Sequence, residues 1–470
     1  IANHLVGAMD KSVTDIDQAV SDIQDGATIL IGGFGGSGTP FNLLNALIRK
    51  GARKLTVVSN SSAQWWPLVE SGQVSRIISG FTNNPRRSVV TDTVNKLVLE
   101  EKLRVETVPH GTLEERLRAA AMGIAAFFTT AGVGTDIEKG KRKEVFGSQE
   151  YLLEHALHAD FALVKGWKGD RWGNIVCRLG AGNRNIIMAA AGKTTIAEVE
   201  EVVELGTLEP NRIEIPGVFV QRVIRAPKVT VWLHQEATDK EMPPDKVVRD
   251  TLGLSRELIA MRAAQELEDG MVVNLGFGLP TQVCNFIPAG REVILHSQQG
   301  TFGYGPIVTD EGMWDIDLVN ASGQPVTLVP GASFSDFATS FGMIRGGHLD
   351  ATVLGAYQVS ESGDLANWQL PGKKVGGIGG AMELALGARR VIIVMEHTGP
   401  QGEPKIVREC TYPLTARRVV NTIITNLACI EVTPSGLLLK ETAPGISVQQ
   451  VKGLTGPPLL LSPELKEMIL

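Results

Sequence analysis

Short apolar runs alternate with amphipathic segments along the chain. Runs of this kind, rich in Val, Ile and Leu, are typical of strands buried on both faces, and LEERLRAAAMGI (residues 113–124) has the period of a helix. The alternation predicts an α/β protein whose mainly parallel sheets carry helices on both faces, with ligands at the carboxyl ends of the strands. The runs that carry this prediction are KLTVVSN, FALVKGW, EVILHS, VTLVPG, ATVLGAY and RVIIVMEH.

The same series of elements occurs twice. AVSDIQDGATILIGGFGGSGTP (residues 19–40) contains a helix end, an Asp-Gly turn, an apolar strand and a glycine loop that closes on proline, and AAQELEDGMVVNLGFGLP (residues 263–280) repeats that order. A second pair joins residues 158–174 to residues 348–367, each with His-x-Asp, an apolar strand and a Gly-Asp turn. Two repeats in the same order predict two related lobes with a site between them.

The segment between the repeats is charged, contains prolines and has no sustained apolar period. These features are typical of a linker. We therefore expect one domain over residues 1–225, a linker over residues 226–253 and a second domain over residues 254–470.

Charge, apolar stretches and cysteine spacing exclude several classes of function. A net charge of −6, spread along 470 residues, gives no basic face for nucleic acid. The longest apolar stretch, residues 186–192, is far too short for a membrane span. We expect a soluble protein of the cytoplasm, or of the mitochondrial matrix if a targeting peptide has been removed. The cysteines lack paired or metal-ligand spacing, which predicts buried thiols and no metal site; they are Cys177, Cys284, Cys410 and Cys429.

The first glycine loop, residues 33–38, matches the pattern of dinucleotide-binding loops. Such a site also needs an acidic residue for the ribose at the end of the next strand, and that strand ends in Ser59 and Asn60. The loop therefore indicates backbone N–H groups that approach an acyl or phosphate ligand, with tight strand-to-helix packing as the alternative. The residues placed in substrate binding on this ground are Gly35, Gly36, Ser37 and Gly38.

Other side chains face the predicted cleft. His110 follows a strand and a proline, and Thr112 with Glu115 predicts a capping box for the next helix, so His110 is either a functional donor or a turn residue. Arg86 is either a solvated cation or a planar partner for a substrate carboxylate. Trp65 and Trp66 are core or interface aromatics, or else a substrate wall.

The motifs resemble those of family I coenzyme A transferases. DGATILIGGFGGSGTP is similar to the first signature of that family, and LHSQQG (residues 295–300) is similar to the second, Leu-His-Ser-Glu-Asn-Gly. Further counterparts occur along nearly the whole chain in the succinyl-CoA:3-oxoacid and 3-oxoadipate types, whose halves are separate subunits or one fused chain. They are PHGTLEERLRA, LHADFALVKGWKGDRWGN, MIRGGHLD, GDLANW, GGIGGAME and ECTYPLT.

The resemblance implies a CoA-transferase-like fold and covalent chemistry. A glutamate attacks the acyl-CoA carbonyl, an acyl-glutamyl anhydride forms, and CoA thiolate converts it to a glutamyl-CoA thioester while the first acid leaves. Acyl-CoA and carboxylic acids are the partners, with coenzyme A as a substrate and no tightly bound cofactor. The resemblance also implies a homodimer or homotetramer.

Carried over position by position, the nucleophile falls on Gln298. His110 takes the place of a glutamine that lends an oxyanion donor, and Gly380 matches the glycine whose amide completes the oxyanion hole. Asn274, Gly276 and Gly278 match residues beside the thioester and the CoA arm. Gly300 completes the turn and is grouped with them, and Lys405 matches a partner for a CoA phosphate or is a solvated lysine.

Gln298 departs from the family pattern, as does Gln299 at the position of the usual Asn. An amide nitrogen is a poor nucleophile and an amide oxygen carries no charge, so Gln298 predicts neither anhydride nor thioester. Two accounts are open: a glutamate-to-glutamine variant that stops turnover, or a protein that binds CoA thioesters without turnover. A CoA-thioester hydrolase on the same fold is a further alternative.

Overall fold

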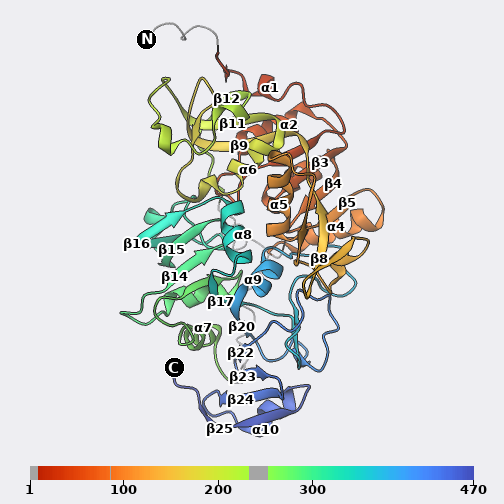
Figure 1. Cartoon of the computed structure of the whole chain (residues 1–470), viewed down its shortest axis with the longest axis vertical. Helices are drawn as coiled ribbons and strands as arrows, with labels where there is room; N and C mark the ends of the chain where they lie inside the picture. Colours follow the sequence, from red (N-terminus) through yellow and green to blue (C-terminus); the bar gives the residue numbers. More distant parts are fainter. Residues whose placement is uncertain (1–8, 85, 232–251) are drawn as a thin grey trace.

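Each half of the chain builds one large sheet around five parallel strands (Figure 1). The computed structural model describes residues 9–84, 86–231 and 252–470. The five strands run in the order β12-β11-β9-β2-β3 in the first half and β22-β20-β17-β13-β14 in the second. Within each half these strands follow the same sequence along the chain, so the prediction of two related lobes with mainly parallel sheets is confirmed.

At both edges of this core the first sheet continues with parallel strands, whereas the second adds antiparallel strands at both edges. The first sheet contains β1 (Ser12–Val13), β2 (Thr28–Ile31), β3 (Leu55–Ser59), β4 (Val74–Ser79), β5 (Arg104–Thr107), β9 (Ala159–Asp170), β10 (Ile175–Val176), β11 (Gly192–Val203) and β12 (Arg222–Arg225). The second contains β13 (Val272–Leu275), β14 (Ile294–Ser297), β15 (Thr301–Ile307), β16 (Val326–Phe334), β17 (Leu349–Leu354), β20 (Ala388–Met395), β22 (Thr422–Thr425), β23 (Ala428–Thr433), β24 (Gly436–Thr442) and β25 (Leu459–Glu467).

Two small sheets and ten α-helices complete the described part of the chain. The small sheets are β6 (Ala126–Thr129), β7 (Lys143–Phe146) and β8 (Gln149–His155), and β18 (Gln358–Ser360), β19 (Leu365–Ala366) and β21 (Ile406–Val407). The helices are α1 (Ile16–Ala19), α2 (Phe41–Lys50), α3 (Ser62–Glu70), α4 (Ser88–Leu99), α5 (His110–Ala121), α6 (Asn185–Ala191), α7 (Arg256–Ala264), α8 (Phe337–Arg345), α9 (Ala381–Gly387) and α10 (Val448–Leu454). Among the described residues, none of the helices combines the length and apolar character needed to cross a membrane.

The strands of the two large sheets lie on opposite sides of the predicted linker. Those of the first fall within residues 12–225 and those of the second within residues 272–467. The linker prediction itself, residues 226–253, falls largely on residues 232–251, which lie outside the described residues. The domain boundaries therefore stay a prediction.

Alternate side chains of the first sheet enter two separate cores, as expected for strands covered on both faces. Ile29 and Ile31 of β2 belong to one cluster with Leu43 and Leu47 of α2, whereas Leu30 belongs to another that includes residues of α5 and α6. Because both faces of β2 are buried, its sequence is continuously apolar.

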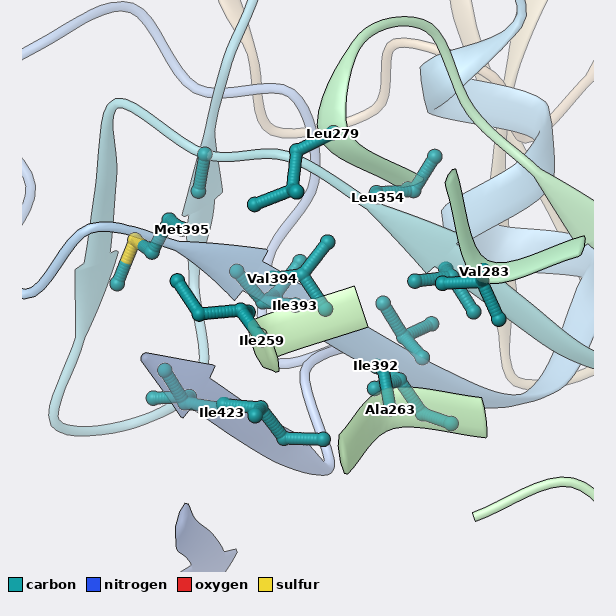
Figure 2. Packing of buried hydrophobic residues seen from close by; sticks show 14 of the residues in the cluster. Ile259, Ala263, Leu279, Val283, Leu354, Ile392, Ile393, Val394, Met395 and Ile423 are labelled. Carbon is teal, nitrogen blue, oxygen red and sulfur yellow. The ribbon is translucent and has the colours of Figure 1, made fainter. Parts of the chain in front are cut away.

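The core of the second half packs α7 and the segment after β13 against β20 and β22 (Figure 2). Ile259 and Ala263 of α7 lie against Ile392 and Ile423 of these strands. Several side chains of the cluster also line a cavity at the carboxyl ends of the strands, so this core forms part of the cavity wall. They are Leu279, Leu354, Val394 and Met395.

At the centre of the molecule, α5 of the first half packs against α8 of the second, with α6 against α5 and α9 against α8 (Figure 1). Arg345 pairs with Glu115 at 2.9 Å and donates to the carbonyl of Gly111. Glu383 accepts from the backbone N–H and the hydroxyl of Thr112 at 2.8 and 3.1 Å. The predicted capping box is therefore wrong: α5 begins at His110, and Thr112 bonds across the interface because Glu383 supplies a buried acceptor.

One tight turn joins β14 to β15 and presents residue 298. Ser297 pairs with Thr301, so Gln298, Gln299 and Gly300 form the loop. Gly300 has a φ of 101°, and a Cβ there would lie 2.0 Å from the carbonyl oxygen of Ser335. Both the backbone conformation and the close approach require glycine.

Replacing Gly300 by alanine should disrupt this turn. Gly290 provides a matched control, because its φ is 83° but a Cβ there meets open space. We expect Gly290→Ala to lower the free energy of unfolding by about 1 kcal/mol and Gly300→Ala by clearly more, about 3 kcal/mol. Urea unfolding measures both, and equal losses would contradict the steric role of Gly300.

Glu383 predicts a pH dependence of stability. Burial is the main reason that the pKa of this carboxyl rises from 4.5 to about 7. Because the folded-state pKa lies above the unfolded value, the folded chain keeps a proton that the unfolded chain releases, and the free energy of unfolding falls as pH rises from 4.5 to 7.

Glu383→Gln should remove about 2 kcal/mol of that fall between pH 5 and pH 7. Urea unfolding at the two pH values measures it, with Gln in place of the exposed Glu409 as the control. A Glu383→Gln protein that retains the full pH dependence of the unsubstituted chain would rule out this origin.

Candidate functional site

Two adjoining cavities lie at the carboxyl ends of the strands, at the contact between the halves. The Gln298 cavity, of about 340 Å³, is lined mainly by residues of the second half, and the Arg86 cavity, of about 380 Å³, mainly by residues of the first. They share wall residues from both halves, namely Phe81, Asn83, Phe277 and Ala321. An isolated bridge between Phe81 and Gly377 joins the halves at this wall.

Gln298 is 7% exposed and lies between His110 and Gly380. Its Oε1 is 3.3 Å from His110 Nδ1. A Cβ on Gly380 would come within 2.4 Å of the same oxygen, so no larger residue fits at position 380 with this side chain in place. The three residues that the resemblance placed in catalysis are therefore brought together.

His110 is fully buried and neutral. Burial and the nearby Arg184 cation lower its pKa well below the ordinary value. Because an amide oxygen only accepts, His110 Nδ1 donates to Gln298 Oε1, and a carboxylate at position 298 could accept the same bond. The backbone N–H of His110 donates to the carbonyl of Gly379 at 2.7 Å, which fixes this end of α5 to the second half.

Asn274, Gly276 and Gly278, which the resemblance placed beside the thioester and the CoA arm, line the Gln298 cavity. Their contact with CoA stays a prediction. Gly276 lies close to β17, because a Cβ there would be 2.9 Å from the side chain of Leu354. Gly278 has a φ of 86° and its N–H donates to Ser322 Oγ at 2.9 Å. The loop after β13 therefore forms one wall of the cavity, in which Gly276 and Gly278 alternate with larger residues such as Phe277 and Leu279.

Lys405 lines the same cavity and is half-buried. Burial is the main reason that its pKa falls from 10.5 to about 8. Its Nζ makes no hydrogen bond or ion pair with any residue that the structure describes. Lys405 is therefore a cation in the cavity that remains available to an anionic ligand.

The Arg86 cavity contains two of the predicted substrate-binding residues, Gly35 and Arg86. The Arg86 guanidinium donates to the carbonyl of Ser322 and lies 5.4 Å from the ring centre of Phe277. Trp66 lines this cavity, whereas Trp65 is fully buried in the core.

Other predicted residues lie behind the cavity walls. Gly36 approaches Ile316, Ser37 Oγ donates to Asp317 at 3.4 Å, and a Cβ on Gly38 would meet the carbonyl of Ala181 at 2.4 Å. Gly300 completes the turn that carries Gln298. In this structure these four residues contact protein atoms, and their role as ligands of a substrate or of CoA stays a prediction.

Several residues around the site are not marked by any motif or period in the sequence. Ser340 and Arg184 lie far along the chain from residue 298 and His110, and neither stands in a motif with recognisable spacing. Phe81 lines the Gln298 cavity from a loop, where no apolar period marks it. His296 is fully buried with both ring nitrogens hydrogen-bonded.

The sequence of the chain matches a family of known proteins. The family model described as "Coenzyme A transferase" matches residues 13–226 and 256–454. Succinyl-CoA:3-ketoacid coenzyme A transferase 2B, mitochondrial, from Mus musculus is 42% identical over 480 residues, which cover 97% of this chain and 90% of that protein. The acetate CoA-transferase subunit beta of Escherichia coli (strain K12) is 49% identical over 201 residues, which cover 43% of this chain and 91% of that protein.

The fold agrees with a solved structure as well. The acyl-CoA transferase (YdiF) apoenzyme from Escherichia coli O157:H7 superposes with a TM-score of 0.78, covers 98% of this chain and 95% of its own, and is 22% identical. The family match extends over both halves, and the mouse relative spans nearly the whole chain. The chain belongs to the coenzyme A transferase family.

Proposed function

We propose that the chain is the scaffold of a CoA-transferase that moves CoA from a donor such as succinyl-CoA to a 3-oxo acid. The observation that carries this proposal is the enclosure of the side chain at position 298 by His110 and Gly380, in a cavity that also contains Asn274 and Lys405. The names of the mammalian relatives, succinyl-CoA:3-ketoacid coenzyme A transferases, support this choice of donor and acceptor.

With a glutamate at position 298, the carboxylate would attack the acyl-CoA carbonyl and release CoA thiolate. The thiolate would then attack the glutamyl carbonyl of the anhydride, releasing the first acid and leaving a glutamyl-CoA thioester. The His110 N–H is positioned to stabilise an oxyanion beside residue 298, and the Gly380 backbone lies close to the same oxygen. Burial of residue 298 keeps water from the intermediates.

The glutamine in the sequence interrupts this chemistry at its first step. Glutamine has the shape of glutamate, so it preserves the contacts with His110 and Gly380 while it removes the charge that makes a nucleophile. The other close contacts of the site are present in the chain with glutamine at position 298, including the approach of Gly300 to Ser335 in the turn. We therefore propose that the chain as written is impaired in turnover and that a single substitution restores it.

Gln298→Glu should make the protein a CoA-transferase. After incubation with acetoacetyl-CoA, intact-mass measurement should find a covalent CoA adduct on the Gln298→Glu protein and none on the unsubstituted chain. The same variant should exchange label between succinate and succinyl-CoA. Gln299→Glu, one residue further along the same turn, is the matched control and should give neither result, because position 298 keeps its amide and the side chain at position 299 lies toward Val319 rather than in the Gln298 cavity.

Other outcomes identify the alternatives. If Gln298→Glu yields neither adduct nor exchange, the transferase proposal fails. Free acid released from acyl-CoA without an acceptor would support a hydrolase. Tight CoA binding without turnover by both forms would support a CoA-thioester binding protein.

Lys405 should contribute a pH-dependent part of the affinity for CoA phosphates. Its pKa of about 8 means that the cation, and with it the attraction for phosphate, is lost as pH rises from 7 to 9. We expect Lys405→Met to weaken the binding of 3′-phospho-ADP about fivefold at pH 7 and to have little effect at pH 9.

Isothermal titration calorimetry measures this difference, and replacement of the exposed Lys452 by Met controls for the loss of a positive charge. The ligand has no thiol, so the titration of the CoA sulfur does not contribute. An effect of Lys405→Met that is the same at both pH values would contradict the assignment.

We further propose that the protein uses CoA and acyl-CoA as substrates and assembles as a homodimer or homotetramer, which light scattering after gel filtration measures. The mouse and human relatives are named as mitochondrial, which supports the matrix as the compartment among the two expected.

A further inference from the structure

Buried hydrogen bonds connect the turn at residue 298 to Asn274 on the neighbouring strand. The side chains in this chain of bonds are Asn274, His296 and Ser340, each at most 1% exposed, and it ends at the backbone carbonyl of Gln298. None of the catalytic steps described above uses His296 or Ser340.

The direction of these bonds is determined from the Asn274 end. The carbonyl oxygen of His296 can only accept, so the Asn274 atom at 3.1 Å from it is the amide nitrogen, Nδ2. The same nitrogen lies 3.1 Å from His296 Nδ1, which must therefore accept. A neutral imidazole has one N–H, and it is placed on Nε2. Burial lowers the pKa of His296 to about 3, so the ring is neutral.

The opposite end leads to the same tautomer. The carbonyl oxygen of Gln298 can only accept, so Ser340 Oγ donates its one proton there, at 2.9 Å. Ser340 Oγ must then accept from His296 Nε2, at 2.8 Å. Two carbonyl groups at opposite ends of the network thus independently require the N–H on Nε2.

This arrangement leaves one polar atom of Asn274 without a partner. Both N–H bonds of its amide are directed to His296, and its Oδ1 is buried with no hydrogen-bond partner among the described residues. Asn274 lines the Gln298 cavity. A buried acceptor at a cavity wall is satisfied when a ligand supplies a donor.

We propose that His296 and Ser340 are positioning residues that fix the Asn274 carboxamide with Oδ1 as an acceptor for a donor on the pantetheine arm of CoA, and that tie this acceptor to the backbone of residue 298. The ligand in this proposal rests on the proposed function. The donor is either the thiol S–H or an amide N–H of the arm. In this arrangement the Asn274 carboxamide, which holds the arm, and residue 298, which carries the acyl chemistry, keep a fixed separation.

The tautomer of His296 tests the network without any ligand. Nitrogen NMR of the ¹⁵N-histidine-labelled protein, assigned by the signal lost in His296→Phe, should find a protonated Nε2 and an unprotonated Nδ1. Ser340→Ala removes the acceptor and should broaden or shift the His296 signals. A protonated Nδ1 in the unsubstituted protein would overturn the proposal.

The affinities for two ligands test the link to the pantetheine arm. His296→Phe keeps a ring against Phe302, whose centre lies 4.8 Å from that of His296, but removes the hydrogen bonds. We expect it to weaken the binding of CoA about tenfold and to leave 3′-phospho-ADP, which lacks the arm, unchanged. S-methyl-CoA separates the donors: a loss that persists with this ligand assigns an amide N–H, and a loss that disappears assigns the thiol.

His397→Phe is the matched control, because His397 is also fully buried with both ring nitrogens bonded to threonine hydroxyls. Any effect of His397→Phe should fall on both ligands alike. Equal losses for CoA and 3′-phospho-ADP in His296→Phe, or no loss for either, would overturn the positioning role. If the unsubstituted protein binds neither ligand, the proposed function fails, whereas the tautomer measurement still decides the network.

Discussion

The contact between His110 of the first half and the side chain at position 298 of the second constrains the structure around it. For the two to meet at 3.3 Å, both neighbours must be small: a Cβ on Gly80 would lie 2.1 Å from the His110 ring, and one on Gly380 would lie 2.4 Å from Gln298 Oε1. The contact also requires α5 to dock on the second half, which the bonds between Thr112 and Glu383 provide. Neither half alone contains this site.

The repeated architecture explains why the site lies where it does. In both halves the loop after the first core strand and the end of the next strand line a cavity: Gly35 and Asn60 in the first half, Gly276 and Gln298 in the second. The halves differ directly after this second strand. The first continues from β3 into α3, whereas the second turns back from β14 into β15, and the tight turn between them carries residue 298.

The repeats and apolar runs were sufficient to predict the two related sheets, because strands buried on both faces are continuously apolar in sequence. The family resemblance singled out Gln298, Gly380, Asn274 and Lys405, and all four line one cavity in the structure. Predictions from neighbouring residues alone failed where a residue of the other half makes the contact. The expected capping box at Thr112 is absent because the Thr112 hydroxyl donates to Glu383. The bonds through Ser340 could not be foreseen, because they depend on a residue 42 positions from Gln298.

Position 298 is where we expect a CoA thioester to form once a carboxylate stands there. The most direct measurement is peptide mapping of the Gln298→Glu protein after incubation with acetoacetyl-CoA, with tandem mass spectrometry to locate the modified residue. We expect the CoA mass on the side chain at position 298. A CoA mass on any other residue, or an unmodified peptide from a folded protein that binds CoA, would contradict it.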